Sequence, residues 1–168
     1  MNAAQMQIIP EIRAWFDSQG WSIHPHQRDM LERAHDPATL LIAPTGGGKT
    51  MAGFLPTLNE LADGQHEGLH TLYVSPLKAL AADIKRNLRR PVEEMDLPIR
   101  VEDRTGDTSY TKKRRQRADP PHILLTTPES LALLLSYEDA PRMFAVLQRV
   151  VVDEIHALAE NKRGDQLM

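Results

Sequence analysis

Short apolar runs alternate with amphipathic segments along most of the chain. Continuous apolar runs lie at residues 39–43, 71–74, 122–126 and 149–152, with a weaker one at 99–101. Runs of this length, rich in Val, Ile, Leu and Thr, are typical of strands that are buried on both faces. We therefore predict a strand in each of these segments.

Helices are predicted between the strands. Apolar residues recur every three to four positions in residues 49–61 and again in 77–88, which is the pattern of one helix face. Pro56 predicts a kink or an early break in the first helix, and Pro91 is expected to limit the second. Further helices are expected at residues 8–18, 25–34 and 127–135.

This alternation predicts an α/β fold, with a mostly parallel sheet and helices on both of its faces. Ligands of such sheets bind at the carboxyl ends of the strands. We therefore expect the functional residues directly after each strand.

Composition narrows the classes of protein. The chain has 168 residues, a length typical of one domain, and no cysteine, which excludes disulfides and thiolate metal sites. No apolar run approaches the roughly 20 residues of a membrane span, and the N-terminus lacks the pattern of a secretory signal. We expect a cytoplasmic protein with no membrane partner.

The charge is unevenly distributed. The formal net charge is −3, yet residues 85–117 carry 11 basic and 6 acidic side chains, a local net charge of +5. Two basic clusters, residues 85–90 and 112–117, dominate this stretch. They are either a solvated helix face and a solvated loop, or contacts to a phosphate backbone.

The loop after the first predicted strand has the pattern of a phosphate-binding P-loop. Residues 43–50 read APTGGGKT, with Ala43 where the general pattern has its first glycine. Glycines let backbone N–H groups surround a phosphate, Lys49 can reach the β- and γ-phosphates, and the Thr50 hydroxyl can bind Mg²⁺. The candidate nucleotide-binding residues are Thr45, Gly46, Gly47, Gly48, Lys49 and Thr50.

Two carboxylates follow the last predicted strand. Asp153 is placed to hold Mg²⁺ through water, and Glu154 to polarise the water that attacks the γ-phosphate. An acidic pair alone is often a surface turn, and His156 alone is more often a locally satisfied histidine. Together with the P-loop, however, the pair predicts a nucleoside triphosphatase.

These motifs, with three others in order between them, closely resemble the first RecA-like lobe of the superfamily 2 DExH-box helicases. Residues 43–50 match motif I, 75–80 motif Ia, 105–108 the TGD element, 126–130 the TPE/S element and 153–156 motif II in its DExH form. Residues 24–27 resemble the region that places a glutamine on adenine. The chain is most similar to the large-helicase-related group, and within it to the ligase-associated DExH-box DNA helicases.

The resemblance implies roles for particular residues. Lys49, Asp153, Glu154 and His156 would be catalytic, and Gln27 would bind the adenine of ATP. A loop hydroxyl, a lysine or a backbone N–H suits contact with a phosphate backbone, and Thr127 could equally be a helix cap. The residues implied on the nucleic-acid side are Ser75, Pro76, Lys78, Thr105, Gly106 and Thr127.

The resemblance also implies the domain organisation and the partners. Residues 1–36 would be an N-terminal helical segment with the adenine-recognition glutamine, and residues 37–168 the first lobe, cut off after motif II. A second lobe, single-stranded DNA and DNA-repair proteins such as a ligase would be partners, with movement 3′ to 5′. The alternatives are a motor on RNA, a translocase that does not unwind, and a nucleotide-binding module without catalysis. By itself the chain is expected to hydrolyse little ATP.

Overall fold

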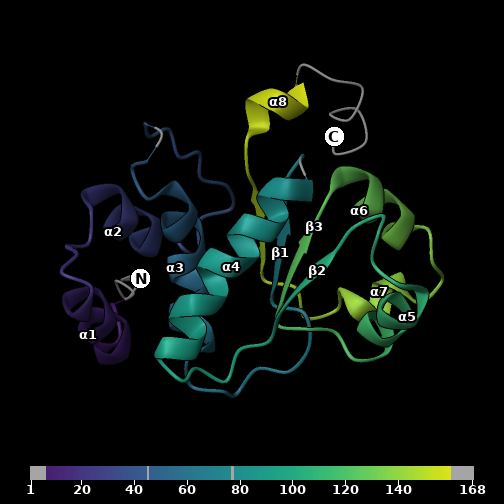
Figure 1. The fold of residues 1–168 in the computed structure, drawn as a ribbon, viewed down its shortest axis with the longest axis horizontal. Helices are drawn as coiled ribbons and strands as arrows, with labels where there is room; N and C mark the ends of the chain where they lie inside the picture. Colours follow the sequence, from purple (N-terminus) through teal and green to yellow (C-terminus); the bar gives the residue numbers. More distant parts are fainter. Residues whose placement is uncertain (1–6, 45, 77, 160–168) are drawn as a thin grey trace. The chain divides into compact units, whose positions relative to one another are not determined.

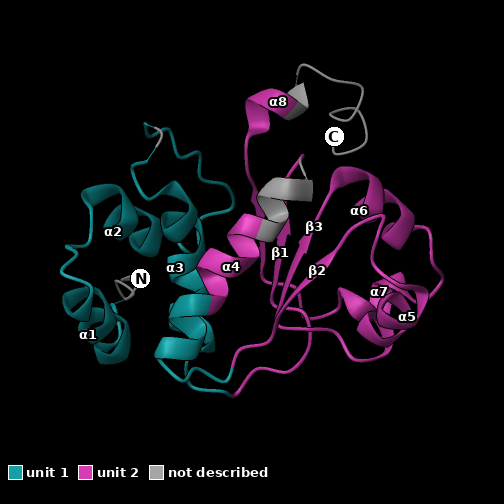
Figure 2. Ribbon diagram, viewed as in Figure 1, with its two compact units in different colours: residues 1–64, 90–98 teal, residues 65–89, 99–168 magenta. Residues whose placement is uncertain are grey.

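The computed structural model describes residues 7–44, 46–76 and 78–159, without the side chains of 78–82, 158 and 159 (Figure 1). Thr45 and the side chain of Lys78, both predicted site residues, lie outside the described part. The chain forms two compact units, one of Met1–Gly64 with Arg90–Pro98 and the other of Gln65–Arg89 with Ile99–Met168 (Figure 2). The expected boundary between residues 36 and 37 stays a prediction.

The first unit is helical. It contains α1 (Pro10–Ser18), α2 (Pro25–Glu32), α3 (Lys49–Leu61) and the last turn of α4 (Lys78–Glu94). Helix α2 packs on α3, and the side chains of Trp15 and Phe16 are buried, with ring centroids 5.4 Å apart. These helices confirm the predictions for residues 8–18 and 25–34.

Neither proline ends its helix where the sequence predicted a limit. Helix α3 continues past Pro56, because Leu55, Pro56 and Leu58 are all buried and their packing holds the segment together. Helix α4 continues past Pro91 to Glu94. Its last turn is anchored, since Glu94 accepts a hydrogen bond of 2.7 Å from Trp15 Nε1 and pairs with Arg90 at 2.8 Å.

Residues 39–43 do not form the predicted strand. The segment has no regular secondary structure, and the side chains of Leu40 and Ile42 are 71% and 86% exposed. A strand is held by hydrogen bonds to a neighbouring strand, and none of the described strands pairs with this segment. The prediction is wrong because an apolar run indicates β propensity, not a pairing partner.

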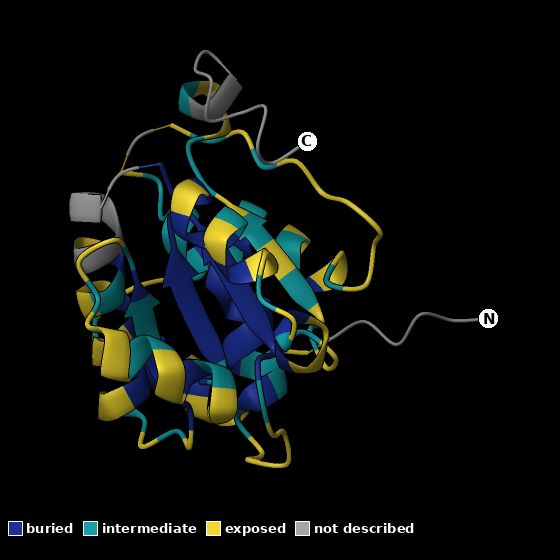
Figure 3. Ribbon diagram, turned by 90° about the vertical axis from the view of Figure 1, so that its right-hand side faces the viewer, coloured by how far each residue is buried: buried dark blue, intermediate teal, exposed yellow. Residues whose placement is uncertain are grey.

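The second unit is built on a four-stranded sheet. Its strands are β1 (Thr71–Val74), β2 (Val101–Arg104), β3 (Ile123–Thr126) and β4 (Arg149–Val152), in the order β2-β3-β1-β4 with every pair parallel. The central strands β1 and β3 are buried throughout, and dark blue strands mark this core in Figure 3. The parallel sheet confirms the predicted α/β fold.

Helices contact both faces of this sheet. Leu72 and Leu124 pack with residues of α6 (Pro128–Leu135) and α7 (Ala140–Met143) on one face. Side chains alternate between faces along a strand, so Asp103 projects from the opposite face, where Lys85 of α4 donates to it. A short helix, α8 (Ile155–Ala159), follows β4.

The second basic cluster forms a helix rather than a loop. Helix α5 (Tyr110–Ala118) is capped by Ser109, whose hydroxyl accepts a hydrogen bond from the backbone N–H of Lys112. Arg115 pairs with Glu102 at 2.7 Å, and Lys112 pairs with Asp103 at 3.1 Å. The carboxylates of β2 therefore offset the mutual repulsion of the basic residues and attach α5 to this edge strand.

Candidate nucleotide and nucleic-acid site

The glycine-rich loop of the first unit has the backbone geometry of an anion cradle. Gly46 and Gly48 have φ values of 80° and 72°, in the left-handed region that favours glycine. Gly48 precedes the first residue of α3 and, as a glycine, has no side chain with which to cap the N–H groups of the helix's first turn. Free N–H groups at a helix N-terminus attract phosphate. Lys49 and Thr50 form the start of α3 and are partly exposed.

Gln27 is connected to this loop. Its side chain is only 3% exposed. Its Oε1 accepts a hydrogen bond of 2.9 Å from the backbone N–H of His24, and its Nε2 donates to the carbonyl of Gly48 at 3.4 Å. The residue predicted to read adenine thus contacts the loop predicted to bind the phosphates.

The acidic pair lies in the second unit, at the carboxyl end of β4. Asp153 accepts two hydrogen bonds, from the backbone N–H of Glu154 to Oδ1 at 2.8 Å and from the Tyr73 hydroxyl to Oδ2. Glu154 has a φ of 51°, and its Oε2 lies 3.0 Å from His156 Nε2. The structure therefore brings Asp153, Glu154 and His156 together as a connected group.

Sequence reasoning missed Tyr73 as part of this group. The only signal was a tyrosine within an otherwise aliphatic, buried strand. Burial, followed by the hydrogen bond to Asp153, raises the pKa of the Tyr73 phenol above its ordinary value. The phenol is therefore a stable donor to the carboxylate at neutral pH.

The predicted nucleic-acid residues gather at one edge of the sheet. Because all four strands are parallel, the segments that follow them lie at the same edge as Asp153. Ser75, Pro76 and Thr127 are buried there, whereas Thr105 is partly exposed and Gly106 is exposed.

Thr127 caps α6, as one of its two predicted roles requires. Its hydroxyl accepts a hydrogen bond from the backbone N–H of Ser130 at 3.4 Å and lies 3.2 Å from the Ser130 hydroxyl.

The TGD loop is held by its own contacts. The N–H of Thr105 donates to Thr108 Oγ1 at 2.9 Å, and Lys113 Nζ donates to the carbonyl of Gly106 at 3.0 Å.

Much of the positive charge in residues 85–117 is already paired. Arg117 pairs with Asp139 at 3.2 Å and lies over the ring of Tyr137, 3.8 Å from its centroid. Arg104 is 1% exposed and donates to the carbonyl of Lys113 at 2.9 Å. Among the residues that the structure describes, Arg89, Arg104, Lys113 and Arg114 of this stretch have no ion-pair partner. The clusters consequently offer less free charge than the sequence suggests.

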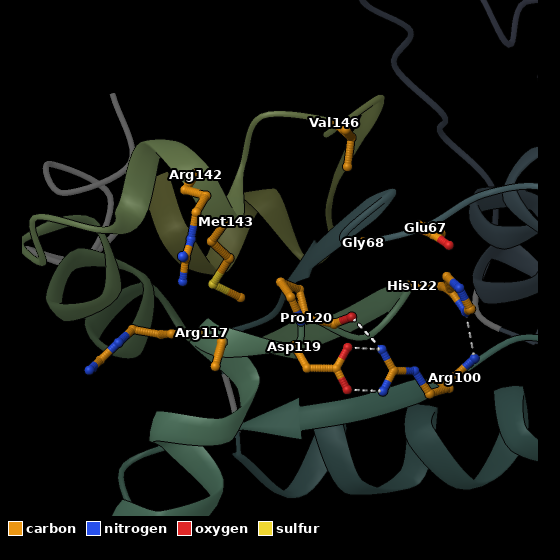
Figure 4. A pocket seen from close by; sticks show the side chains of 11 residues that line it. Glu67, Gly68, Arg100, Arg117, Asp119, Pro120, His122, Arg142, Met143 and Val146 are labelled. Carbon is orange, nitrogen blue, oxygen red and sulfur yellow. Dashed lines mark hydrogen bonds and ion pairs between the residues drawn. The ribbon is translucent and has the colours of Figure 1, made fainter.

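A cavity of about 720 Å³ lies elsewhere in the second unit (Figure 4). Its lining includes Arg100, His122 and Val146, each of which precedes a strand. Arg100 binds both carboxylate oxygens of Asp119 at 2.7 Å. The cavity is therefore at the amino ends of the strands, opposite the edge that carries the motif residues, and is not the candidate site.

Comparison with known proteins identifies the family. The sequence profile described as DEAD/DEAH box helicase matches residues 24–168. The chain belongs to the DEAD/DEAH box helicase family. Its membership confirms the resemblance to superfamily 2 helicases that the motifs indicated.

Relatives within this helicase family carry the name Lhr. The ATP-dependent helicase Lhr-Core protein 2 of Thermococcus barophilus is 44% identical over 177 residues, which cover 96% of this chain and 20% of that protein. The Lhr helicase/probable uracil glycosylase of Mycolicibacterium smegmatis is 44% identical over 169 residues, covering 92% of this chain and 11% of that protein. The chain thus spans a fifth or less of these relatives.

Solved helicase structures share the fold. The structure of Mycobacterium smegmatis helicase Lhr bound to ssDNA and AMP-PNP matches with a TM-score of 0.81 and 42% identity, covering 95% of this chain and 22% of that one. The helicase MrfA bound to DNA and AMPPNP matches with a TM-score of 0.79 and 28% identity, covering 94% and 22%. Within the described ranges, no helix is both long and apolar enough to cross a membrane.

Proposed function

We propose that this chain is the first RecA-like lobe of a longer ATP-dependent helicase or translocase that moves along single-stranded DNA. The observation that carries the proposal is a glycine cradle at the start of α3 in the same chain as an oriented acidic pair at the end of β4. The similar Lhr structure, which holds ssDNA and AMP-PNP, supports both ligands.

The nucleotide-binding role rests on the P-loop geometry. Its N–H groups and Lys49 would hold the phosphates of ATP, and Gln27 would contact the adenine. Gly48 has a φ of 72°, which favours glycine, and a Cβ built on it would lie 2.8 Å from Gln27 Nε2, so the end of the glutamine side chain would have to shift. The residues proposed to bind ATP are Gln27, Thr45, Gly46, Gly47, Gly48, Lys49 and Thr50.

The chain also offers residues for Mg²⁺. In ATPases this ion is held by one or two protein oxygens together with substrate phosphates, rather than by a cage of side chains. By this proposal, the Thr50 hydroxyl and the Asp153 carboxylate would each supply such an oxygen, the latter through water. When bound, Mg²⁺ neutralises charge on the phosphates. Glu154 would accept a proton from the attacking water, and His156 would hold its carboxylate in place.

The strand would bind at the carboxyl edge of the sheet. The residues proposed there are Ser75, Pro76, Lys78, Thr105, Gly106 and Thr127. Ser75 and Thr127 are buried, and the Ser75 N–H already donates to the carbonyl of Thr126 at 3.0 Å, whereas the exposed Gly106 can approach a phosphate directly. Movement 3′ to 5′, a cytoplasmic setting, a role in DNA repair and a ligase partner complete the proposal.

The test uses the protein that carries both lobes. Lys49→Ala should abolish binding of ATP, whereas Glu154→Gln should bind ATP but lose turnover by roughly 10²-fold or more. Binding is measured with a fluorescent ATP analogue and turnover with and without single-stranded DNA, with the exposed Glu11→Gln as the control. Stronger stimulation of ATP turnover by RNA than by DNA would favour a motor that acts on RNA. The absence of any ATP turnover would favour a nucleotide-binding module without catalysis.

A further inference from the structure

A buried hydroxyl stands beside the catalytic carboxylates. Tyr73 is 1% exposed in the middle of β1. A buried hydroxyl without a hydrogen-bond partner costs free energy that a phenylalanine would avoid. The Tyr73 hydroxyl donates to Asp153 Oδ2, so this contact explains why the position carries a tyrosine.

The register of the sheet directs the two side chains toward each other. Tyr73 is paired with Val151 on the neighbouring β4. Asp153 lies two residues beyond Val151, and its N–H donates to the carbonyl of Val74 at 3.0 Å, which continues the pairing past the end of β4. Because side chains alternate between faces, Asp153 projects on the same face as Tyr73. The phenol reaches it diagonally across the two strands.

Both oxygens of the carboxylate are consequently held. The Glu154 N–H binds Oδ1 at 2.8 Å and the Tyr73 hydroxyl binds Oδ2. The backbone bond is local, whereas Tyr73 comes from a different, fully buried strand. This second contact is the one that fixes the rotation of the carboxylate relative to the sheet.

We infer that Tyr73 is a positioning residue, whose hydroxyl presets the carboxylate of Asp153 for the Mg²⁺ that accompanies ATP. The inference rests on the proposed role of Asp153 in the nucleotide site. Removing a hydrogen-bond partner that orients a metal-binding group commonly lowers metal affinity or activity about 10- to 100-fold. The hydroxyl of Tyr73 is such a partner.

The test is the Mg²⁺ dependence of nucleotide binding in Tyr73→Phe, which keeps the buried ring and removes only the hydroxyl. Affinity for a fluorescent, non-hydrolysable ATP analogue is measured from metal-free buffer to millimolar Mg²⁺. We expect the Mg²⁺ concentration at half-saturation to rise roughly 10- to 100-fold, while affinity without metal is unchanged. Tyr110→Phe is the matched control, because Tyr110 is 72% exposed.

A double-mutant cycle and thermal melting separate positioning from packing. In an Asp153→Asn background, Tyr73→Phe should cause no further change in Mg²⁺ dependence. An unchanged Mg²⁺ requirement in Tyr73→Phe overturns the inference, as does an equal loss of affinity with and without metal alongside a lower melting temperature. If the wild-type protein binds the analogue independently of Mg²⁺, the proposed role of Asp153 fails, and the inference fails with it.

Discussion

Gln27 and Gly48 are joined by a hydrogen bond of 3.4 Å, from Nε2 of the glutamine to the carbonyl oxygen of the glycine. Gly48 adopts a φ of 72° at the start of α3, and Gln27 is buried against it. The contact ties the predicted adenine-reading residue to the phosphate loop. The bound nucleotide and the packing of α2 on α3 are therefore expected to depend on the same glycine.

Gly48→Ala should lower both stability and nucleotide affinity. A side chain in the left-handed region costs about 1–2 kcal/mol, and the added Cβ would lie 2.8 Å from Gln27 Nε2. We expect the free energy of unfolding to fall by at least this amount in urea titrations. Binding of an ATP analogue should weaken in parallel.

Gly20→Ala is the matched control for this substitution. Gly20 has a φ of 69°, but a Cβ there would meet no atom within 4 Å. Gly20→Ala should lower the free energy of unfolding only by the cost of the left-handed backbone conformation, because its added Cβ collides with no other atom. Gln27→Ala combined with Gly48→Ala should recover part of the loss, and equal costs at Gly20 and Gly48 would contradict the contact.

The fold was predictable where local pattern and tertiary pairing agree. The apolar runs at residues 71–74, 122–126 and 149–152 became β1, β3 and β4, because each has a parallel neighbour. Residues 39–43 have the same pattern but pair with none of the strands in the described part of the chain. Helix α5 was not predicted, because its basic sequence has no apolar face. The helix depends instead on ion pairs with the carboxylates of β2.

The sequence indicated the motifs of the candidate site but not its contacts. Spacing indicated the P-loop and the acidic pair as candidates, because phosphate and Mg²⁺ chemistry requires those residue types, although of these two motifs only the acidic pair follows a described strand. No spacing rule connects Tyr73 to Asp153 or Gln27 to Gly48, which are 80 and 21 residues apart. These contacts depend on sheet register and helix packing.

Asp103→Asn should destabilise the second unit through two lysines. Lys85 and Lys112 both donate to Asp103, and they lower the pKa of its carboxyl although burial alone raises it. Its stabilising effect is thus present at neutral pH and is lost as the pH falls through the lowered pKa. We expect a loss of about 1 kcal/mol at pH 7, reduced by salt.

Asp36→Asn provides the comparison for Asp103→Asn. Asp36 pairs with Arg33 at 3.4 Å, but its side chain is 46% exposed against 25% for Asp103. An exposed pair contributes little, so urea titration of this variant should match the wild type. A similar loss in both variants would show that the burial of Asp103 is irrelevant.

His122 should make stability depend on pH in the mildly acidic range. Its Nδ1 accepts a hydrogen bond from the Arg100 N–H at 2.9 Å, and its Nε2 lies 3.1 Å from the carbonyl of His66. Burial, and then the positive charge of Arg100, lower the pKa of His122. The unfolded chain therefore binds the proton more readily, and stability should fall as the pH drops below about 6.5.

The measurement compares the melting temperatures of the wild type and His122→Asn between about pH 5 and pH 8. The variant should lose part of this pH dependence. The exposed His35→Asn should keep it, because His35 has no comparable burial. A wild-type slope that persists unchanged in His122→Asn would assign the effect to another group.

Thr127 allows capping to be separated from contact with nucleic acid. Thr127→Ala should lower the free energy of unfolding by about 1 kcal/mol, whereas Thr127→Ser and Thr127→Asn, which can still cap α6, should stay near the wild type. Because Thr127 is 3% exposed and its hydroxyl is already bonded to Ser130, affinity for single-stranded DNA should follow stability across these variants. Anisotropy titrations with a labelled oligonucleotide measure it. If Thr127→Asn is fully stable yet binds DNA more weakly, the threonine side chain itself contacts the strand.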